Sequence, residues 1–181
     1  MRSQNNKNIT RRLVFDALLT AIALIIFLVE AQFPPIVPVP GVKLGLANMM
    51  TVYAMFELGP KDTFAIMLCR IILGSILGGQ FISFLFSLSG GICCYLTMLV
   101  MRKLLAENQI WVCGIIGALA HNIGQMIAAM IIMKTRMVFV YFLILAVSGI
   151  ITGFFTGMSA QLIIRHIHKV TNHNKFHKEV M

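Results

Sequence analysis

Long apolar runs, separated by short polar or basic segments, dominate this chain. Most of the runs approach the roughly 20 residues that an α-helix needs to cross a bilayer. Hydrophobic residues make up 59% of the chain and charged residues 12%, whereas a soluble domain is about 45–50% apolar and about 25% charged. The length of 181 residues permits six helices with short loops. The sequence therefore predicts an all-α integral membrane protein with six transmembrane helices.

The polar breaks between the runs set the expected limits of the spans. These spans are about 13–31, 44–58, 63–79, 81–101, 111–133 and 138–164. The second is short for a full crossing, so we expect it to be tilted or incomplete. A basic N-terminal segment, 1–12, and a basic tail that contains four histidines, 165–181, flank the helices. The first run is too long for the apolar region of a signal peptide, so we interpret it as a helix.

Lysine and arginine residues are unequally distributed between the two sides of this arrangement. With both termini on one side, eleven of the 15 basic residues lie on that side, three lie on the other, and Arg70 falls within a span. Cytoplasmic loops of membrane proteins carry the excess of positive charge. We therefore expect both termini on the cytoplasmic side of the membrane. The net charge of +9 follows from this topology, and we expect no nucleic-acid partner.

The stretch from Pro34 to Pro60 combines a stiff, proline-rich loop with a short apolar run. It places Lys43 and Asn48 at the outer mouth of the second span, and it ends at the helix-breaking pair Gly59-Pro60. Such a loop suits a membrane protein that captures a small molecule at the bilayer surface. Alternatively, Lys43 marks only the membrane interface.

Arg70 lies about two turns into the third expected span. An ionisable side chain within the bilayer is costly, and it is a functional-site hypothesis by default. Its candidate partners are Glu57, Glu30 and a bound anion. Alternatively, a buried ion pair of Arg70 fixes the packing of the helices.

Further polar residues interrupt the fourth and fifth expected spans. In the fifth, His121 and Gln125 are four residues apart and share a helix face, and Asn122 is adjacent to His121. They predict either the polar wall of a ligand cavity or hydrogen bonds between helices. In the fourth, Ser87 and Ser89 precede two glycines, a pattern typical of a kink or of an unwound segment that lines a cavity.

Small residues recur at the spacing that lets helices approach closely. Ala17 and Ala21 form such a pair in the first span, and Gly149, Gly153 and Gly157 form a double GxxxG in the sixth. Packing within the chain is the ordinary explanation, and docking of a second subunit is the alternative.

The sequence lacks several motifs that carry catalysis in other proteins. Its six acidic residues are scattered, so no acidic cluster can hold Mg²⁺ on a diphosphate, and no nucleotide-binding P-loop is present. The four cysteines lack metal-ligand spacing, and the histidines of the tail are typical of a solvated basic segment. We therefore expect neither catalysis by this chain alone, nor a cofactor, nor a metal site.

Four segments together resemble one bacterial membrane family, the Gx transporter family, also described as heptaprenyl diphosphate synthase component I. They are GVKLGLAN (41–48), ELGPKDTFAIMLCRIILGSILGG (57–79), SLSGG (87–91) and GALAHNIGQ (117–125). The family looks like the substrate-binding S components of energy-coupling factor (ECF) transporters. Those are six-helix proteins whose first helix carries a small-residue AxxxA motif, which Ala17 and Ala21 match here.

The resemblance implies an importer subunit in a bacterial plasma membrane that captures a small ligand from outside the cell. It does not supply the ligand, but the basic and polar residues expected to line the cavity favour an anionic or amphipathic one. The expected ligand-binding residues are Lys43, Asn48, Arg70, Ser87, Ser89, His121, Asn122 and Gln125. Uptake would require a coupling transmembrane subunit, docked at Ala17 and Ala21, and two ATPase subunits. The alternative is a non-catalytic membrane partner of a soluble prenyl diphosphate synthase, and weaker alternatives are a structural partner of another membrane complex and an intramembrane enzyme that uses His121.

Overall fold

The computed structural model describes residues 2–33, 45–79, 81–135 and 137–179, and every described segment is helical or a short connection. Its elements are α1 (Arg2–Glu30), α2 (Asn48–Glu57), α3 (Pro60–Gly78), α4 (Phe81–Leu104), the 3-10 helix η1 (Glu107–Gln109), α5 (Ile110–Met133), the 3-10 helix η2 (Met137–Tyr141) and α6 (Phe142–Glu179). The all-α prediction is confirmed for the described residues. The proline-rich loop, including Lys43, lies outside them.

Four segments are long and apolar enough to cross a membrane. They are Ile9–Glu30, Phe81–Leu104, Ile110–Met133 and Phe139–Val170. α2, with 10 residues, is about 15 Å long, roughly half the thickness of the hydrocarbon core. α3 has 19 residues but carries Lys61, Asp62 and Arg70. The chain is thus a membrane protein by its apolar helices, and the prediction of six complete spans is not confirmed.

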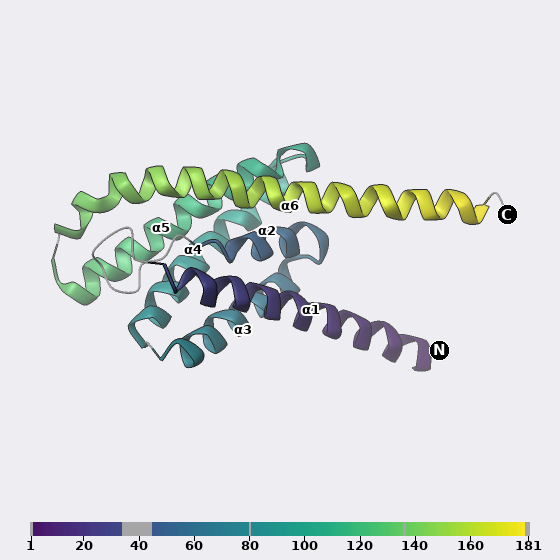
Figure 1. Ribbon diagram of the computed structural model, residues 1–181, viewed down its shortest axis with the longest axis horizontal. Coiled ribbons are helices and arrows are strands. Elements are labelled where there is room, and N and C mark those ends of the chain that lie inside the picture. The colour runs from purple at the N-terminus through teal and green to yellow at the C-terminus, as the bar shows by residue number, and fades with distance from the viewer. Residues whose placement is uncertain (1, 34–44, 80, 136, 180–181) are drawn as a thin grey trace.

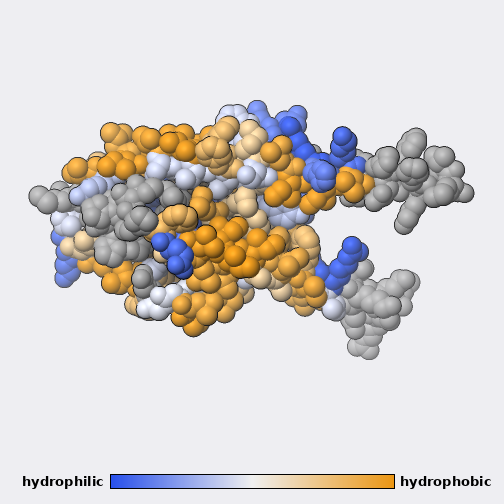
Figure 2. Space-filling view, in the orientation of Figure 1, coloured by the Kyte–Doolittle hydropathy of each residue, from blue (hydrophilic) through white to orange (hydrophobic). Residues whose placement is uncertain are grey.

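The surface of the bundle has the polarity expected of a protein in lipid. Large apolar side chains are exposed over its length, for example Ile76 at 69% and Leu143 at 72%. Figure 2 shows apolar side chains over the body of the molecule, with hydrophilic groups gathered toward its ends. A soluble domain would bury most of these large apolar side chains.

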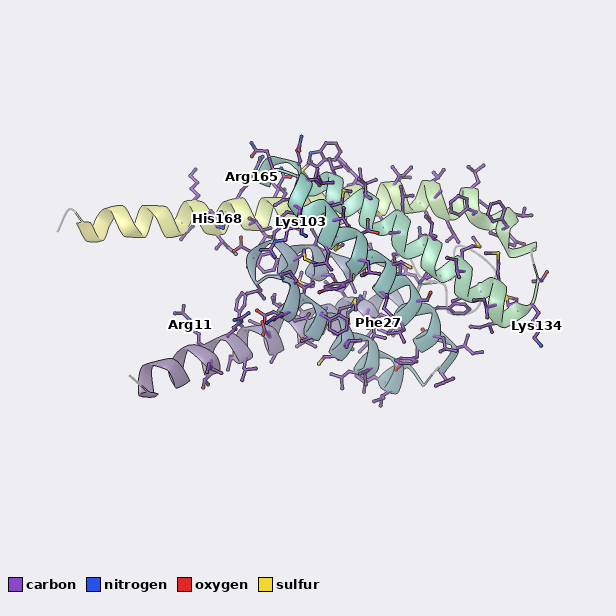
Figure 3. The ribbon with its side chains drawn as sticks, turned by 180° about the vertical axis from the view of Figure 1, so that it is seen from behind. Arg11, Phe27, Lys103, Lys134, Arg165 and His168 are labelled. Atoms are coloured by element: carbon purple, nitrogen blue, oxygen red, sulfur yellow. The ribbon has the colours of Figure 1, made fainter. Side chains whose placement is uncertain are left out.

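Both termini lie at the same end of the bundle (Figure 1). There α1 and α6 extend beyond the other helices, because α1 already begins at Arg2 and α6 continues to Glu179. Both extensions lie outside the first and sixth spans that were expected from the sequence, 13–31 and 138–164. Figure 3 shows Arg11 and His168 at this end and Lys134 at the opposite end.

The short helix α2 occupies the centre of the bundle and contacts each of the other five α-helices. Seven of its ten residues are buried. It stops where the sequence predicted, because Gly59 adopts φ +102° and Pro60 is the first residue of α3. The N–H groups of Leu58 and Gly59 both donate to the carbonyl of Ala54, which closes the last turn of α2.

Glycines bring α4, α5 and α6 into close contact. A Cβ atom built on Gly114 of α5 would lie 2.5 Å from both the carbonyl oxygen of Gly153 and Cα of Gly157 on α6. A Cβ atom on Gly124 would lie 2.6 Å from the carbonyl oxygen of Ser89 on α4. The GxxxG stripe of α6 therefore packs within the chain, which is the ordinary explanation of that pattern.

Polar contacts tie the helices together at the end that holds the termini. Arg12 Nε of α1 donates to Asp62 Oδ2 of α3 at 2.7 Å. Glu57, the last residue of α2, pairs with His168 of α6 at 2.8 Å. Glu57 therefore contacts His168 at this end of the bundle and not Arg70. Glu30, the other glutamate considered as a partner of Arg70, is buried.

Candidate functional site

Arg70 of α3 is buried in the interior of the bundle, with 4% of its surface exposed. Its Nη2 donates to Oδ1 of Asn48, the first residue of α2, at 3.3 Å. Glu30, one of the partners considered from the sequence, lies close enough for its charge to interact with that of Arg70. The Nε of Arg70 has no hydrogen-bond partner among the described residues. A buried guanidinium thus retains unused donor capacity.

Glu30 has a second role, which the sequence did not reveal. This last residue of α1 is buried, and its Oε1 and Oε2 accept hydrogen bonds from the N–H groups of Gly45 and Leu46, at 2.7 and 2.9 Å. These N–H groups belong to the turn that leads into α2. The first N–H groups of a helix lack partners within the helix, and they carry partial positive charge. Glu30 accepts hydrogen bonds from the two N–H groups and places a negative charge beside the start of α2. It thereby holds the end of α1 to the start of α2.

The ring of His121 packs between two glycines from different parts of the chain. A Cβ atom on Gly45 would lie 3.2 Å from His121 Cδ2, and one on Gly90 of α4 would lie 2.8 Å from both Cε1 and Nδ1. Gly45 also has φ +79°, a conformation that favours glycine. His121 Nδ1 has no partner among the described residues. Asn48, Arg70 and His121, all predicted from the sequence, therefore meet at one level of the bundle.

Gln125 lies one turn beyond His121 on α5, on the same helix face. It is completely buried, and neither its Oε1 nor its Nε2 has a hydrogen-bond partner in the described part of the chain. On α4, Ser83, Ser87 and Gly90 share a face because they are spaced four and three residues apart. Ser83 and Ser87 are both buried, and the Ser83 hydroxyl is also unpaired among the described residues. Ser83 was missed in the sequence because a single serine in an apolar run carries no distinct pattern.

Asn122 and Ser89 make contacts between helices. Asn122 Nδ2 donates to the carbonyl oxygen of Leu145 on α6 at 2.6 Å. Ser89 Oγ donates to the carbonyl oxygen of Gly124 on α5 at 2.7 Å. Both side chains therefore already serve the packing of α5 against its two neighbours. Their role as ligand contacts, expected from the sequence, is untested, and the observed contacts favour hydrogen bonding between helices instead.

The remaining residues singled out from the sequence lie elsewhere. Ala17 and Ala21 are exposed on α1, among apolar side chains that are also exposed. Lys43 is outside the described residues. Within the described part of the chain, no three His, Cys, Asp or Glu side chains come together as metal ligands do.

Five of the buried polar residues make up what we call the central cluster: Glu30, Asn48, Arg70, His121 and Gln125. Its residues come from α1, α2, α3 and α5, and Gly90 of α4 packs against it. Buried polar atoms in native proteins are usually hydrogen-bonded, to protein or to ordered water. Unpaired donors on Asn48 and Arg70 therefore indicate a place where another molecule, either a ligand or water, completes the hydrogen bonding.

Comparison with known protein families gives a match over most of the chain. A family model described as heptaprenyl diphosphate synthase component I matches residues 19–163. No curated protein and no solved structure matches the chain significantly. The matched range contains every residue of the central cluster and all of α2, α3, α4 and α5. The chain therefore belongs to the heptaprenyl diphosphate synthase component I family.

Proposed function

We propose that this protein binds a small ligand at the central cluster and serves as the membrane-embedded, S-component-like substrate-binding subunit of an ECF-type importer. The observation that carries the proposal is the group of unpaired buried atoms: Asn48 Nδ2, Arg70 Nε, His121 Nδ1 and both amide atoms of Gln125. Structural ion pairs and packing contacts normally satisfy such atoms, whereas a binding site leaves them for its ligand.

The chemistry of the cluster favours a ligand that brings hydrogen-bond acceptors. Arg70 contributes N–H donors and a positive charge, and the amides of Asn48 and Gln125 add further donors. Guanidinium groups bind carboxylate and phosphate especially well, because two parallel hydrogen bonds match the geometry of those groups. An anionic or amphipathic ligand therefore fits the cluster better than a cation does.

The proposal requires partners for transport. The chain has no nucleotide-binding motif, so energy for uptake would come from two ATPase subunits through a coupling transmembrane subunit. The exposed pair Ala17 and Ala21 on α1 is the proposed docking surface, by resemblance to the AxxxA motif of S components. The termini would lie in the cytoplasm, where basic residues are favoured, and ligand would enter from the opposite end of the bundle.

A second function is favoured by the family description. The chain would then be a non-catalytic membrane subunit that associates with a soluble heptaprenyl diphosphate synthase. The scattered acidic residues agree with a non-catalytic role, because prenyl diphosphate chemistry needs clustered carboxylates for Mg²⁺. Such a subunit would contact the soluble enzyme at its cytoplasmic end and would need no ligand inside the bundle.

Affinity purification of the tagged protein from its native membrane distinguishes the two functions. Mass spectrometry of the retained proteins and metabolites should find a coupling subunit, ATPases and a bound small molecule. Leucine at Ala17 and Ala21 should remove the coupling subunit and leave the bound molecule in place, because the pair lies on the outer surface of α1. Retention of a soluble prenyl synthase without ATPases or a bound molecule would overturn the transporter proposal in favour of the second function.

A further inference from the structure

The surroundings of the Glu30 carboxylate resemble a site for a free anion. Both of its oxygens accept backbone hydrogen bonds, from Gly45 at 2.7 Å and from Leu46 at 2.9 Å. These two N–H groups stand at the start of the turn into α2, a helix of 10 residues. Backbone N–H groups at a helix N-terminus bind carboxylates, phosphates and sulfates in many proteins.

The side chains of Arg70 and Asn48 complete the surroundings of the carboxylate, and both have hydrogen-bond donors without a partner among the described residues. Arg70 and Asn48 are each 4% exposed, and they are joined by a hydrogen bond of 3.3 Å. The Nε of Arg70 and the Nδ2 of Asn48 have no partner among the described residues. The Asn48 Nδ2 lies next to Gly45, 2.8 Å from the position that a Cβ atom there would take. Unpaired donors therefore lie beside the backbone N–H groups that Glu30 occupies.

We propose that Glu30 is an internal occupant of an anion-binding site, and that a carboxylate or phosphate group of the ligand displaces it. The site consists of the N–H groups of Gly45 and Leu46 together with the side chains of Asn48 and Arg70. This inference rests on the proposed ligand-binding function, and it names the chemical group that the ligand presents and the contact that this group replaces.

Displacement follows from the charges. Glu30 lies close enough to the buried Arg70 for their opposite charges to interact. A second anion beside the same guanidinium would place two negative charges close together in an apolar interior, where like charges strongly disfavour each other. An incoming anion therefore replaces Glu30.

The displacement also gives ligand binding a mechanical consequence. Glu30 is the last residue of α1, and its two hydrogen bonds hold that helix end to the start of α2. Loss of these bonds releases the end of α1. Because the face of α1 with Ala17 and Ala21 is exposed, a partner docked there would sense the occupancy of the site.

Chemical rescue tests the inference without knowledge of the native ligand. In purified Glu30→Ala protein, acetate or phosphate should fill the vacated site. We expect a rise in unfolding temperature over chloride at the same ionic strength, several-fold larger than in the wild type. Glu57→Ala is the matched control, because it removes a glutamate that pairs with His168 at the far end of the bundle, and it should show no such gain. Adding Arg70→Gln to Glu30→Ala should abolish the gain.

A second variant covers the case in which Glu30→Ala does not fold. Glu30→Gln keeps the shape of the side chain and removes its charge, so phosphate should bind at least about tenfold more tightly than to the wild type. No anion-specific gain in Glu30→Ala, or equal phosphate affinity in Glu30→Gln, would show that Glu30 only caps α2. A different outcome is that anions rescue Glu30→Ala while the wild type purified from its native membrane carries no bound molecule. That outcome would support the anion site and contradict the proposed function.

Discussion

Alanine at Gly114 tests the packing that holds α5, and with it His121 and Gln125, in place. The new Cβ would lie 2.5 Å from the carbonyl oxygen of Gly153 and 2.5 Å from Cα of Gly157. Carbon atoms pack at about 3.5–4.0 Å, so α5 and α6 must separate by roughly 1 Å. Both opposing atoms belong to the backbone, so a side-chain rotation cannot relieve the clash.

The magnitude follows from two opposing effects. Overpacking of this kind costs about 1–3 kcal/mol, and the rigid backbone contact argues for the upper half of that range. Replacing glycine by alanine within a helix recovers about 0.5–1 kcal/mol. The net loss in the free energy of unfolding should therefore be about 1–2.5 kcal/mol. Gly78→Ala is the matched control, because the described structure has nothing within 4 Å of a Cβ atom there; its stability should stay equal or rise.

The single tryptophan of the chain, Trp111, provides the assay. Its backbone lies at the same contact, where a Cβ atom on Gly157 would approach the Trp111 carbonyl oxygen to 2.7 Å. Reversible unfolding in mixed detergent micelles, followed by tryptophan fluorescence, gives the free energy of unfolding of each variant. Equal stability of Gly114→Ala and wild type, or equal shifts in Gly114→Ala and Gly78→Ala, would refute the packing argument.

Two further predictions separate structural from functional polar groups. Asn122→Ala removes the hydrogen bond to the Leu145 carbonyl and should lower the free energy of unfolding by about 0.6–1.7 kcal/mol, with ligand retention unchanged; loss of the ligand without loss of stability would mean that Asn122 is a ligand contact. Arg12→Gln breaks the pair with Asp62, in which the Arg12 side chain is 58% exposed. An exposed pair is worth at most about 1 kcal/mol, so a larger loss in the same unfolding assay would show that this contact holds α1 to α3.

Several of the expected spans coincide with long helices, because polar breaks bound their apolar runs. The expected span 111–133 differs by one residue from α5 (Ile110–Met133), and 81–101 lies within α4 (Phe81–Leu104). The sequence did not predict that α6 would continue to Glu179. Apolar residues end where a helix leaves lipid, whereas the backbone hydrogen bonds of a helix continue through charged residues such as Lys169.

The candidate site was predicted only in part, because hydropathy does not specify which helix each face meets. His121 and Asn122 are neighbours in sequence, yet successive residues point in directions about 100° apart around a helix. His121 consequently packs against Gly45 and Gly90, whereas Asn122 bonds to α6. The role of Glu30 at the start of α2 requires contacts between residues 15 and 16 positions apart. No local pattern encodes those contacts.

The central claim is that the cluster around Arg70 holds a small ligand inside the bundle. It is tested most directly by native mass spectrometry of the protein purified from its own membrane, with wild type, Arg70→Gln and Asn122→Ala compared at equal amounts of folded protein. We predict a bound small molecule of defined mass in wild type and Asn122→Ala, and its loss in Arg70→Gln. Equal retention in all three, or no bound molecule in any of them, would contradict the account.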